Sequence, residues 1–162
     1  MTNKIALLAL ALGKELTQRE WKLTTAESCT GGGLSYCITS VPGSSGWFER
    51  GFVTYSNTAK EEMLGVKATT LAAYGSVSVQ TVCDMAEGAL RKSQAQVSIA
   101  ITGIAGPDGG SLEKPVGTVW FAIASIHQAT QSFVEVFTGD RQSIRKQAIF
   151  TALEQTLAFI NQ

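Results

Sequence analysis

Two stretches of this sequence run from β-branched and apolar residues directly into glycine-rich loops, and this pattern limits the possible folds most strongly. The first is WKLTTAESCTGGG at 21–33, and the second is QVSIAITGIAGPDGG at 96–110. The second stretch predicts a strand that is buried on both faces and is followed by the turn signal PDGG. A sheet with such a strand needs helices on both faces, so the pattern favours a layered α/β fold.

The remaining segments supply strands and helices in the order that such a fold requires. Apolar spacing and capping residues predict helices at about 3–18, 33–41, 57–64, 69–75, 78–92 and 140–159, with Asn57 and Ser78 as N-caps. Strand composition predicts strands at 21–27, 51–56 and 96–104, and a hairpin of 116–126 with 130–138. This order predicts a three-layer α/β/α sandwich with a mixed, mostly parallel β-sheet, formed by residues 1–162 as one domain.

Charge and cysteine content exclude several classes of protein. Thirteen basic residues balance thirteen acidic ones among 162, which argues against partners such as nucleic acid or an anionic membrane. Cys29, Cys37 and Cys83 lack CxxC spacing and His127 is the only histidine, so we expect no disulfide framework, no metal and a reducing, cytoplasmic setting. The apolar run at 5–12 is shorter than the roughly 20 residues of a membrane span and lacks a cleavage signal. It predicts a buried first helix.

The first glycine-rich loop places a candidate nucleophile, Ser28, where a strand turns into a helix. Backbone N–H groups near Thr30, Gly31 and Gly32 would stand unpaired at the helix start, which suits a phosphate, a carboxylate or an oxyanion. An ordinary tight turn is the alternative, because glycine also serves that purpose. Cys29 is a second possible nucleophile, although small buried cysteines more often only pack.

A serine nucleophile needs a group that accepts its proton. His127 falls in the predicted hairpin turn, and no spacing supports a triad that includes it. A lysine can act as the base if desolvation or a nearby cation lowers its pKa. Lys60 is the better candidate, because it lies in the first turn of a predicted helix, where the positive end of the dipole disfavours the ammonium form. Tyr55 precedes it and could relay or donate a proton. The alternative for Lys60 is an exposed lysine beside Glu61 and Glu62.

The second glycine-rich loop and the start of the last helix add groups for binding an anion. The loop offers further backbone donors, and Arg141 has a planar fork that suits phosphate or carboxylate. A salt bridge from Arg141 to a neighbouring acid is the alternative. The predicted substrate-binding residues are Thr30, Gly31, Gly32, Asn57, Thr102, Gly103, Ala105, Gly106 and Arg141.

Six motifs, spread over nearly the whole chain, resemble those of the family formed by the C-terminal domain of the competence/damage-inducible protein CinA. They are TTAESCTGGG, GSSGWFERGFVTYSNTAK, SVS near residue 78, ITGIAGPDGG, EKPVGTVWFA and TGDR at 138–141. Within that family the sequence is most similar to stand-alone bacterial nicotinamide-nucleotide amidohydrolases.

The resemblance implies a function that the residues alone leave open. It implies hydrolysis of nicotinamide mononucleotide to nicotinate mononucleotide and ammonia, in recycling of the pyridine ring into NAD, with Ser28, Tyr55 and Lys60 as catalytic residues. It also implies an α/β/α fold, no metal or cofactor and a homo-oligomer, for which we expect a dimer. Two alternatives remain at this point: a non-catalytic module that binds a pyridine nucleotide, and a cysteine-dependent amidase that uses Cys29.

Overall fold

The computed structural model describes all residues 1–162 as five strands and six α-helices. In chain order the elements are α1 (Thr2–Gln18), β1 (Leu23–Glu27), α2 (Gly33–Thr39), a 3-10 turn (Ser44–Gly46), β2 (Phe48–Val53), α3 (Asn57–Leu64), α4 (Ala68–Tyr74), α5 (Val79–Arg91), β3 (Val97–Gly103), β4 (Thr118–Ser125), β5 (Gln131–Val136) and α6 (Arg141–Ile160). No helix among them combines the length and the apolar character that crossing a membrane requires.

The strands form one mixed sheet in the order β2-β1-β3-β4-β5. Strand β1 pairs in parallel with β2 on one side and with β3 on the other, so that Glu27 lies opposite both Val53 and Ile101. Strands β4 and β5 form the antiparallel hairpin expected from the sequence, and β4 pairs antiparallel with β3. The prediction of a mixed sheet is confirmed.

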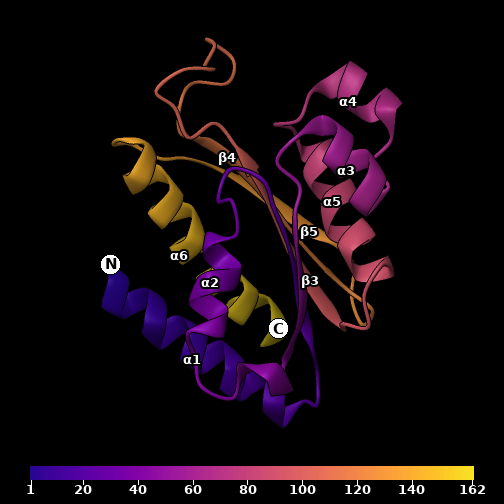
Figure 1. The fold of residues 1–162 in the computed structure, drawn as a ribbon, viewed down its shortest axis with the longest axis vertical. Helices are drawn as coiled ribbons and strands as arrows, with labels where there is room; N and C mark the ends of the chain where they lie inside the picture. Colours follow the sequence, from indigo (N-terminus) through magenta and orange to yellow (C-terminus); the bar gives the residue numbers. More distant parts are fainter.

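Helices cover both faces of this sheet (Figure 1). Helices α1, α2 and α6 lie on one face, and α3, α4 and α5 lie on the other. Because side chains alternate along a strand, Ile99 of β3 packs into the core under the first group while its neighbour Ala100 packs under the second. The larger core contains Phe121 and the smaller one Met85. The predicted three-layer α/β/α sandwich is therefore confirmed.

The second strand and the helix after it differ from the prediction. The predicted strand at 51–56 lies instead at Phe48–Val53, because its pairing with β1 begins where Phe48 lies opposite Leu23. Tyr55 therefore falls beyond the strand, in the turn that leads into α3. The N-cap of α3 is Ser56 rather than Asn57, since the Ser56 side chain accepts a hydrogen bond from the N–H of Ala59.

The strand order brings the two glycine-rich loops together. The chain passes from β1 to β2 through α2 on one face, and from β2 to β3 through α3, α4 and α5 on the other. Strands β1 and β3 are neighbours whose carboxyl ends point the same way. The loops after them meet at the point where the chain changes direction across the sheet, which is where open α/β sheets bind ligands.

Helix α3 approaches α5 so closely that one position between them requires glycine. A Cβ atom added at Gly88 of α5 would lie 2.0 Å from the backbone oxygen of Leu64. We expect Gly88→Ala to lower the free energy of unfolding by about 1–3 kcal/mol, measured by urea unfolding, because the two helices would have to move apart. Gly46→Ala is the matched control, since a Cβ there meets nothing within 4 Å. Equal stability of the two variants would contradict this packing.

Candidate active site

A cleft of about 160 Å³ lies at the carboxyl ends of β1 and β3. The loops after these strands, the turn before α3 and the first residue of α6 contribute to its wall. Most lining side chains are polar. The lining residues are Ser28, Cys29, Tyr55, Asn57, Lys60, Ser76, Thr102, Gly103, Ala105 and Arg141.

The structure brings Ser28 and Lys60 into contact. Ser28 directly follows β1, and its backbone N–H donates to the Ile101 oxygen of β3 at 3.0 Å. Lys60 reaches the same place from α3, and its Nζ lies 3.0 Å from Ser28 Oγ. A second hydrogen bond of 3.0 Å joins Nζ to the backbone oxygen of Thr54. The candidate nucleophile and the candidate base therefore lie within proton-transfer distance.

The surroundings of Lys60 favour an uncharged amine. Its side chain is 1% exposed, so the alternative of an exposed lysine is wrong. Both hydrogen-bond partners of Nζ are neutral oxygens, and no ion pair in the protein includes Lys60. Burial lowers the pKa of Lys60 below its ordinary value, because the ammonium form loses its solvation. With the amine neutral, the Ser28 hydroxyl can donate its proton to the Nζ lone pair.

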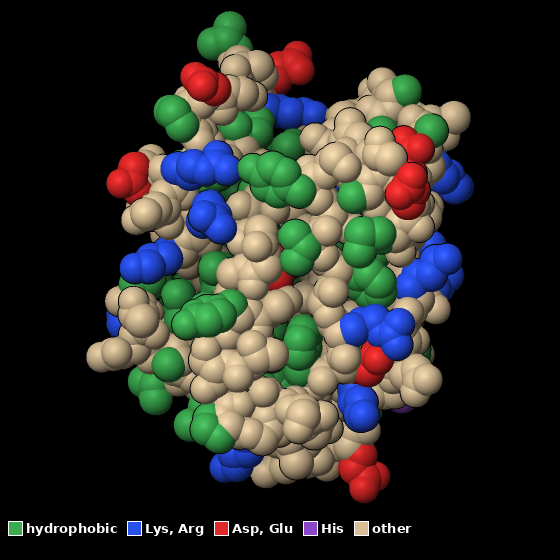
Figure 2. All heavy atoms as spheres, viewed as in Figure 1, with side chains coloured by type: hydrophobic (Ala, Val, Ile, Leu, Met, Phe, Trp, Pro, Cys, Tyr) green, Lys and Arg blue, Asp and Glu red, His purple; other side chains and the backbone are tan.

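Tyr55 and Arg141 form the outer wall of the cleft. Tyr55 is 62% exposed, and its hydroxyl accepts a hydrogen bond from Arg141 Nη2 at 2.9 Å. Arg141 Nη1 donates to the backbone oxygen of Gly106 at 2.7 Å. The structure shows no hydrogen bond from the Tyr55 hydroxyl to Ser28 or Lys60, so it does not form the proton relay that Tyr55 could have provided. Arg141 pairs with no acid, and Figure 2 shows basic side chains gathered over the start of α6.

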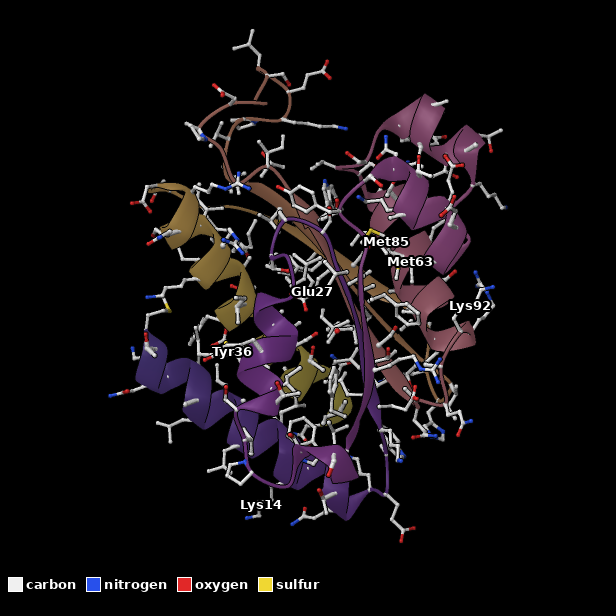
Figure 3. All side chains as sticks on the ribbon, viewed as in Figure 1. Lys14, Glu27, Tyr36, Met63, Met85 and Lys92 are labelled. Atoms are coloured by element: carbon white, nitrogen blue, oxygen red, sulfur yellow. The ribbon has the colours of Figure 1, made fainter.

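Two N–H groups in the first turn of α2 are already bound within the protein. The carboxylate of Glu27 accepts hydrogen bonds from the N–H groups of Leu34 at 2.8 Å and Ser35 at 3.0 Å. The N–H of Gly31 donates to the Ser28 oxygen. Glu27 lies beside the N-terminal end of α2 (Figure 3). The protein therefore supplies its own anion for the N–H groups of Leu34 and Ser35, whereas those of Thr30 and Gly32 donate to no other residue, so anion binding at Thr30, Gly31 and Gly32 stays a prediction.

Some residues that line the cleft carry backbone N–H groups without an acceptor in the protein, and two of these residues lie in the glycine-rich loops. Cys29 and Ala105 both line it, and their N–H groups donate to no other residue. One comes from each glycine-rich loop. This is the arrangement that can stabilise an oxyanion formed beside Ser28.

The predicted substrate-binding residues divide into two groups. Those that line the cleft are Asn57, Thr102, Gly103, Ala105 and Arg141, and those that do not are Thr30, Gly31, Gly32 and Gly106. Among the second group, Gly106 still contributes through its hydrogen bond to Arg141. Sequence reasoning did not single out Ser76, although the SVS motif contains it. Its backbone oxygen accepts a hydrogen bond from Thr102 Oγ1 at 2.7 Å.

Cys29 and His127 lack the properties that catalysis would require of them. Burial raises the pKa of Cys29 to about 12, so its side chain is a thiol near neutral pH and a poor nucleophile. His127 follows β4, at the end of the sheet opposite the cleft, and its ring stacks on Trp21 with 4.6 Å between centroids. Neither residue competes with Ser28 and Lys60.

Comparisons with known proteins identify relatives of this chain. The family model described as "CinA C-terminal domain" matches residues 6–160. "Nicotinamide-nucleotide amidohydrolase PncC" of Shigella flexneri is 51% identical over 152 residues, which cover 94% of this chain and 92% of the relative. The protein of the same name from Pseudomonas putida is 47% identical over 157 residues, covering 96% of each chain. The crystal structure of "competence/damage inducible protein CihA from Agrobacterium tumefaciens" superposes with a TM-score of 0.95 at 44% identity, covering 98% of this chain and 96% of that one.

The buried amine predicts how stability depends on pH. Between the lowered pKa of Lys60 in the folded protein and its ordinary value of 10.5, the unfolded chain binds more protons than the folded one. The free energy of unfolding should therefore rise with pH across this interval. We expect Lys60→Met, which packs a similar chain without an amine, to lose this part of the rise when urea unfolding is measured at several pH values. Identical pH profiles for the two proteins would contradict an uncharged Lys60.

Proposed function

Because this chain belongs to the CinA C-terminal domain family, we propose that it hydrolyses the carboxamide of nicotinamide mononucleotide to give nicotinate mononucleotide and ammonia. The names of its relatives at 47–51% identity support this substrate. The observation that carries the proposal is the 3.0 Å contact between Lys60 Nζ and Ser28 Oγ inside a small polar cleft. A buried, uncharged amine beside a hydroxyl is suited to activating a nucleophile.

The first half of the proposed reaction forms an acyl-enzyme. Neutral Lys60 takes the hydroxyl proton of Ser28, and the serine oxygen attacks the carboxamide carbon. The N–H groups of Cys29 and Ala105 donate to the oxyanion of the tetrahedral intermediate. The carbon–nitrogen bond then breaks, and the departing nitrogen takes the proton from the Lys60 ammonium and leaves as ammonia. The nicotinoyl group remains on Ser28 as an ester.

The second half repeats the same chemistry with water. Lys60, neutral again, takes a proton from a water molecule that attacks the ester carbon. Collapse of the second tetrahedral intermediate breaks its bond to Ser28 Oγ, which receives the proton from Lys60. Nicotinate mononucleotide leaves, and the enzyme returns to its starting state.

The outer wall of the cleft would hold the rest of the nucleotide. Arg141 is the candidate for the phosphate, because its guanidinium lies at the mouth of the cleft without an acidic partner. Tyr55 accepts a hydrogen bond from Arg141, so its own hydroxyl proton remains for the substrate. Asn57 and Thr102 line the space between this wall and Ser28.

Several further predictions accompany this function. The reaction would return the pyridine ring to NAD synthesis in the cytoplasm, without a cofactor. A homo-oligomer, with a dimer as the expected form, also stays a prediction. Simple binding without catalysis is the alternative function. The observation against it is that binding gains nothing from a buried amine held against a serine.

Replacing each of the two adjacent candidate nucleophiles by alanine tests this chemistry directly. We expect Ser28→Ala to lower the rate of ammonia release from nicotinamide mononucleotide by at least about 1,000-fold, because no acyl-enzyme can form. Cys29→Ala is the matched control and should keep activity close to wild type, since only its backbone N–H takes part. Ammonia is measured with a chelator present. Retained activity in Ser28→Ala would exclude the serine mechanism, and loss of activity in Cys29→Ala alone would favour the cysteine.

Removing the Arg141 guanidinium should affect substrate binding more than the chemical step. We expect Arg141→Met to raise KM for nicotinamide mononucleotide by about 10- to 100-fold, the range for losing a hydrogen bond to a charged group. The effect should be much smaller with nicotinamide riboside, which lacks the phosphate. Arg91→Met, at the end of α5, serves as the control for loss of a positive charge. An equal rise in KM for both substrates would contradict phosphate binding by Arg141.

A further inference from the structure

The carboxylate of Glu27 is completely buried and accepts four hydrogen bonds at the start of α2. Its Oε1 accepts from Thr30 Oγ1 at 2.7 Å and from the N–H of Leu34 at 2.8 Å. Its Oε2 accepts from the N–H of Ser35 at 3.0 Å and from Ser35 Oγ at 2.7 Å. Glu27 is the last residue of β1 and directly precedes Ser28. The carboxylate thus ties the end of a strand to the first turn of the following helix.

No basic side chain forms an ion pair with Glu27, so these donors alone compensate its charge. Burying a carboxylate is costly unless such donors surround it, and the N-terminus of a helix supplies them together with a favourable dipole. Two of the four donors are N–H groups that a helix otherwise leaves unpaired. The arrangement therefore satisfies the N–H groups of Leu34 and Ser35 with an internal anion.

Ser28, the proposed nucleophile, lies in the segment between Glu27 and the first turn of α2. The turn 28–32 leaves Glu27 and returns to it through Thr30, and Gly31 donates to the Ser28 oxygen inside the turn. From the opposite side, Arg145 of α6 donates to the backbone oxygens of Cys29 at 3.1 Å and Thr30 at 3.0 Å. The turn is therefore held between a buried anion and a cation. It has little freedom to shift relative to β1.

We propose that Glu27 is the positioning residue that sets Ser28 Oγ against Lys60 and directs the Cys29 N–H into the cleft. Lys60 is held by the backbone oxygen of Thr54, whose N–H donates to the backbone oxygen of Glu27 and not to its carboxylate. A change in the carboxylate therefore acts on the contact between Ser28 and Lys60 through the turn 28–32. Glu27 itself touches neither the cleft nor Lys60. This role rests on the proposed function, because it assumes that Ser28 acts as a nucleophile.

The test replaces Glu27 by glutamine, which keeps the size of the side chain but removes its charge. The introduced amide can satisfy only part of the four-donor set, since its NH₂ group would replace an oxygen that accepts from one N–H and one hydroxyl. A displacement of the nucleophile by a fraction of an ångström to about 1 Å lowers the rate by up to about 100-fold. We therefore expect kcat per folded molecule in Glu27→Gln to fall by about 10- to 100-fold, with KM within about threefold of wild type.

Two further variants separate positioning from a loss of stability. Ser98→Ala removes a buried 2.6 Å hydrogen bond to Ala86 at the opposite end of β3, and it should leave kcat per folded molecule unchanged. Ser35→Ala removes one side-chain donor to Glu27, and it should lower kcat by about 3- to 10-fold without a change in charge. If Glu27→Gln does not fold, Ser35→Ala carries the test alone. A kcat within about twofold of wild type in a folded Glu27→Gln, or in Ser35→Ala in that case, would overturn the proposal.

A second measurement distinguishes failure of this proposal from failure of the proposed substrate. Diisopropyl fluorophosphate transfers its phosphoryl group to a reactive serine and releases fluoride, without any need for a nucleotide. We expect Ser28 in the wild type to react about 10- to 100-fold faster than in Glu27→Gln. If the wild type reacts but releases no ammonia from nicotinamide mononucleotide, the substrate is wrong and the role of Glu27 still stands. Equal rates of fluoride release from the two proteins would overturn that role.

Discussion

The site depends on one buried amine that has no counter-charge. Lys60 Nζ lies between Ser28 Oγ and the backbone oxygen of Thr54, two neutral acceptors, in a place that water barely reaches. An ammonium ion would lose its solvation there without gaining an ion pair, so burial lowers the pKa of Lys60 and favours the free base. A free lysine base at neutral pH can activate a serine without histidine or metal. The position of every other group in the cleft can be related to this pair.

The fold positions the pair by bringing distant segments to one edge of the sheet. Ser28 follows β1, Lys60 follows β2 by way of a short turn, and Ala105 follows β3. These three strands are parallel neighbours, so their carboxyl ends place all three residues together. Arg141 comes from the start of α6 and closes the outer wall. The chain uses the crossing point of the sheet to build a small polar site.

The sequence predicted the layers of this fold because they depend on strong local patterns. It pointed to Ser28 and Lys60 for other reasons, namely the lack of a usable histidine, the place of Lys60 in the first turn of a helix, and the family resemblance. It did not reveal how deeply Lys60 is buried, since Glu61 and Glu62 beside it suggest an exposed segment. The helical period does contain the signal: Lys60 and Leu64 lie four residues apart and are the buried residues of α3. The role of Glu27 was missed for a different reason. Its partners at positions 30, 34 and 35 are only identified once the start of α2 is known.

The most direct test of the central claim is the titration of Lys60 itself. In protein labelled with ¹³C at the lysine Cε, the chemical shift of each lysine reports protonation of its amine, and a Lys60→Arg variant identifies the resonance of residue 60. The account predicts that the pKa of Lys60 lies clearly below the ordinary lysine value of 10.5. A Lys60 resonance that titrates at or above 10.5 would contradict an uncharged base beside Ser28.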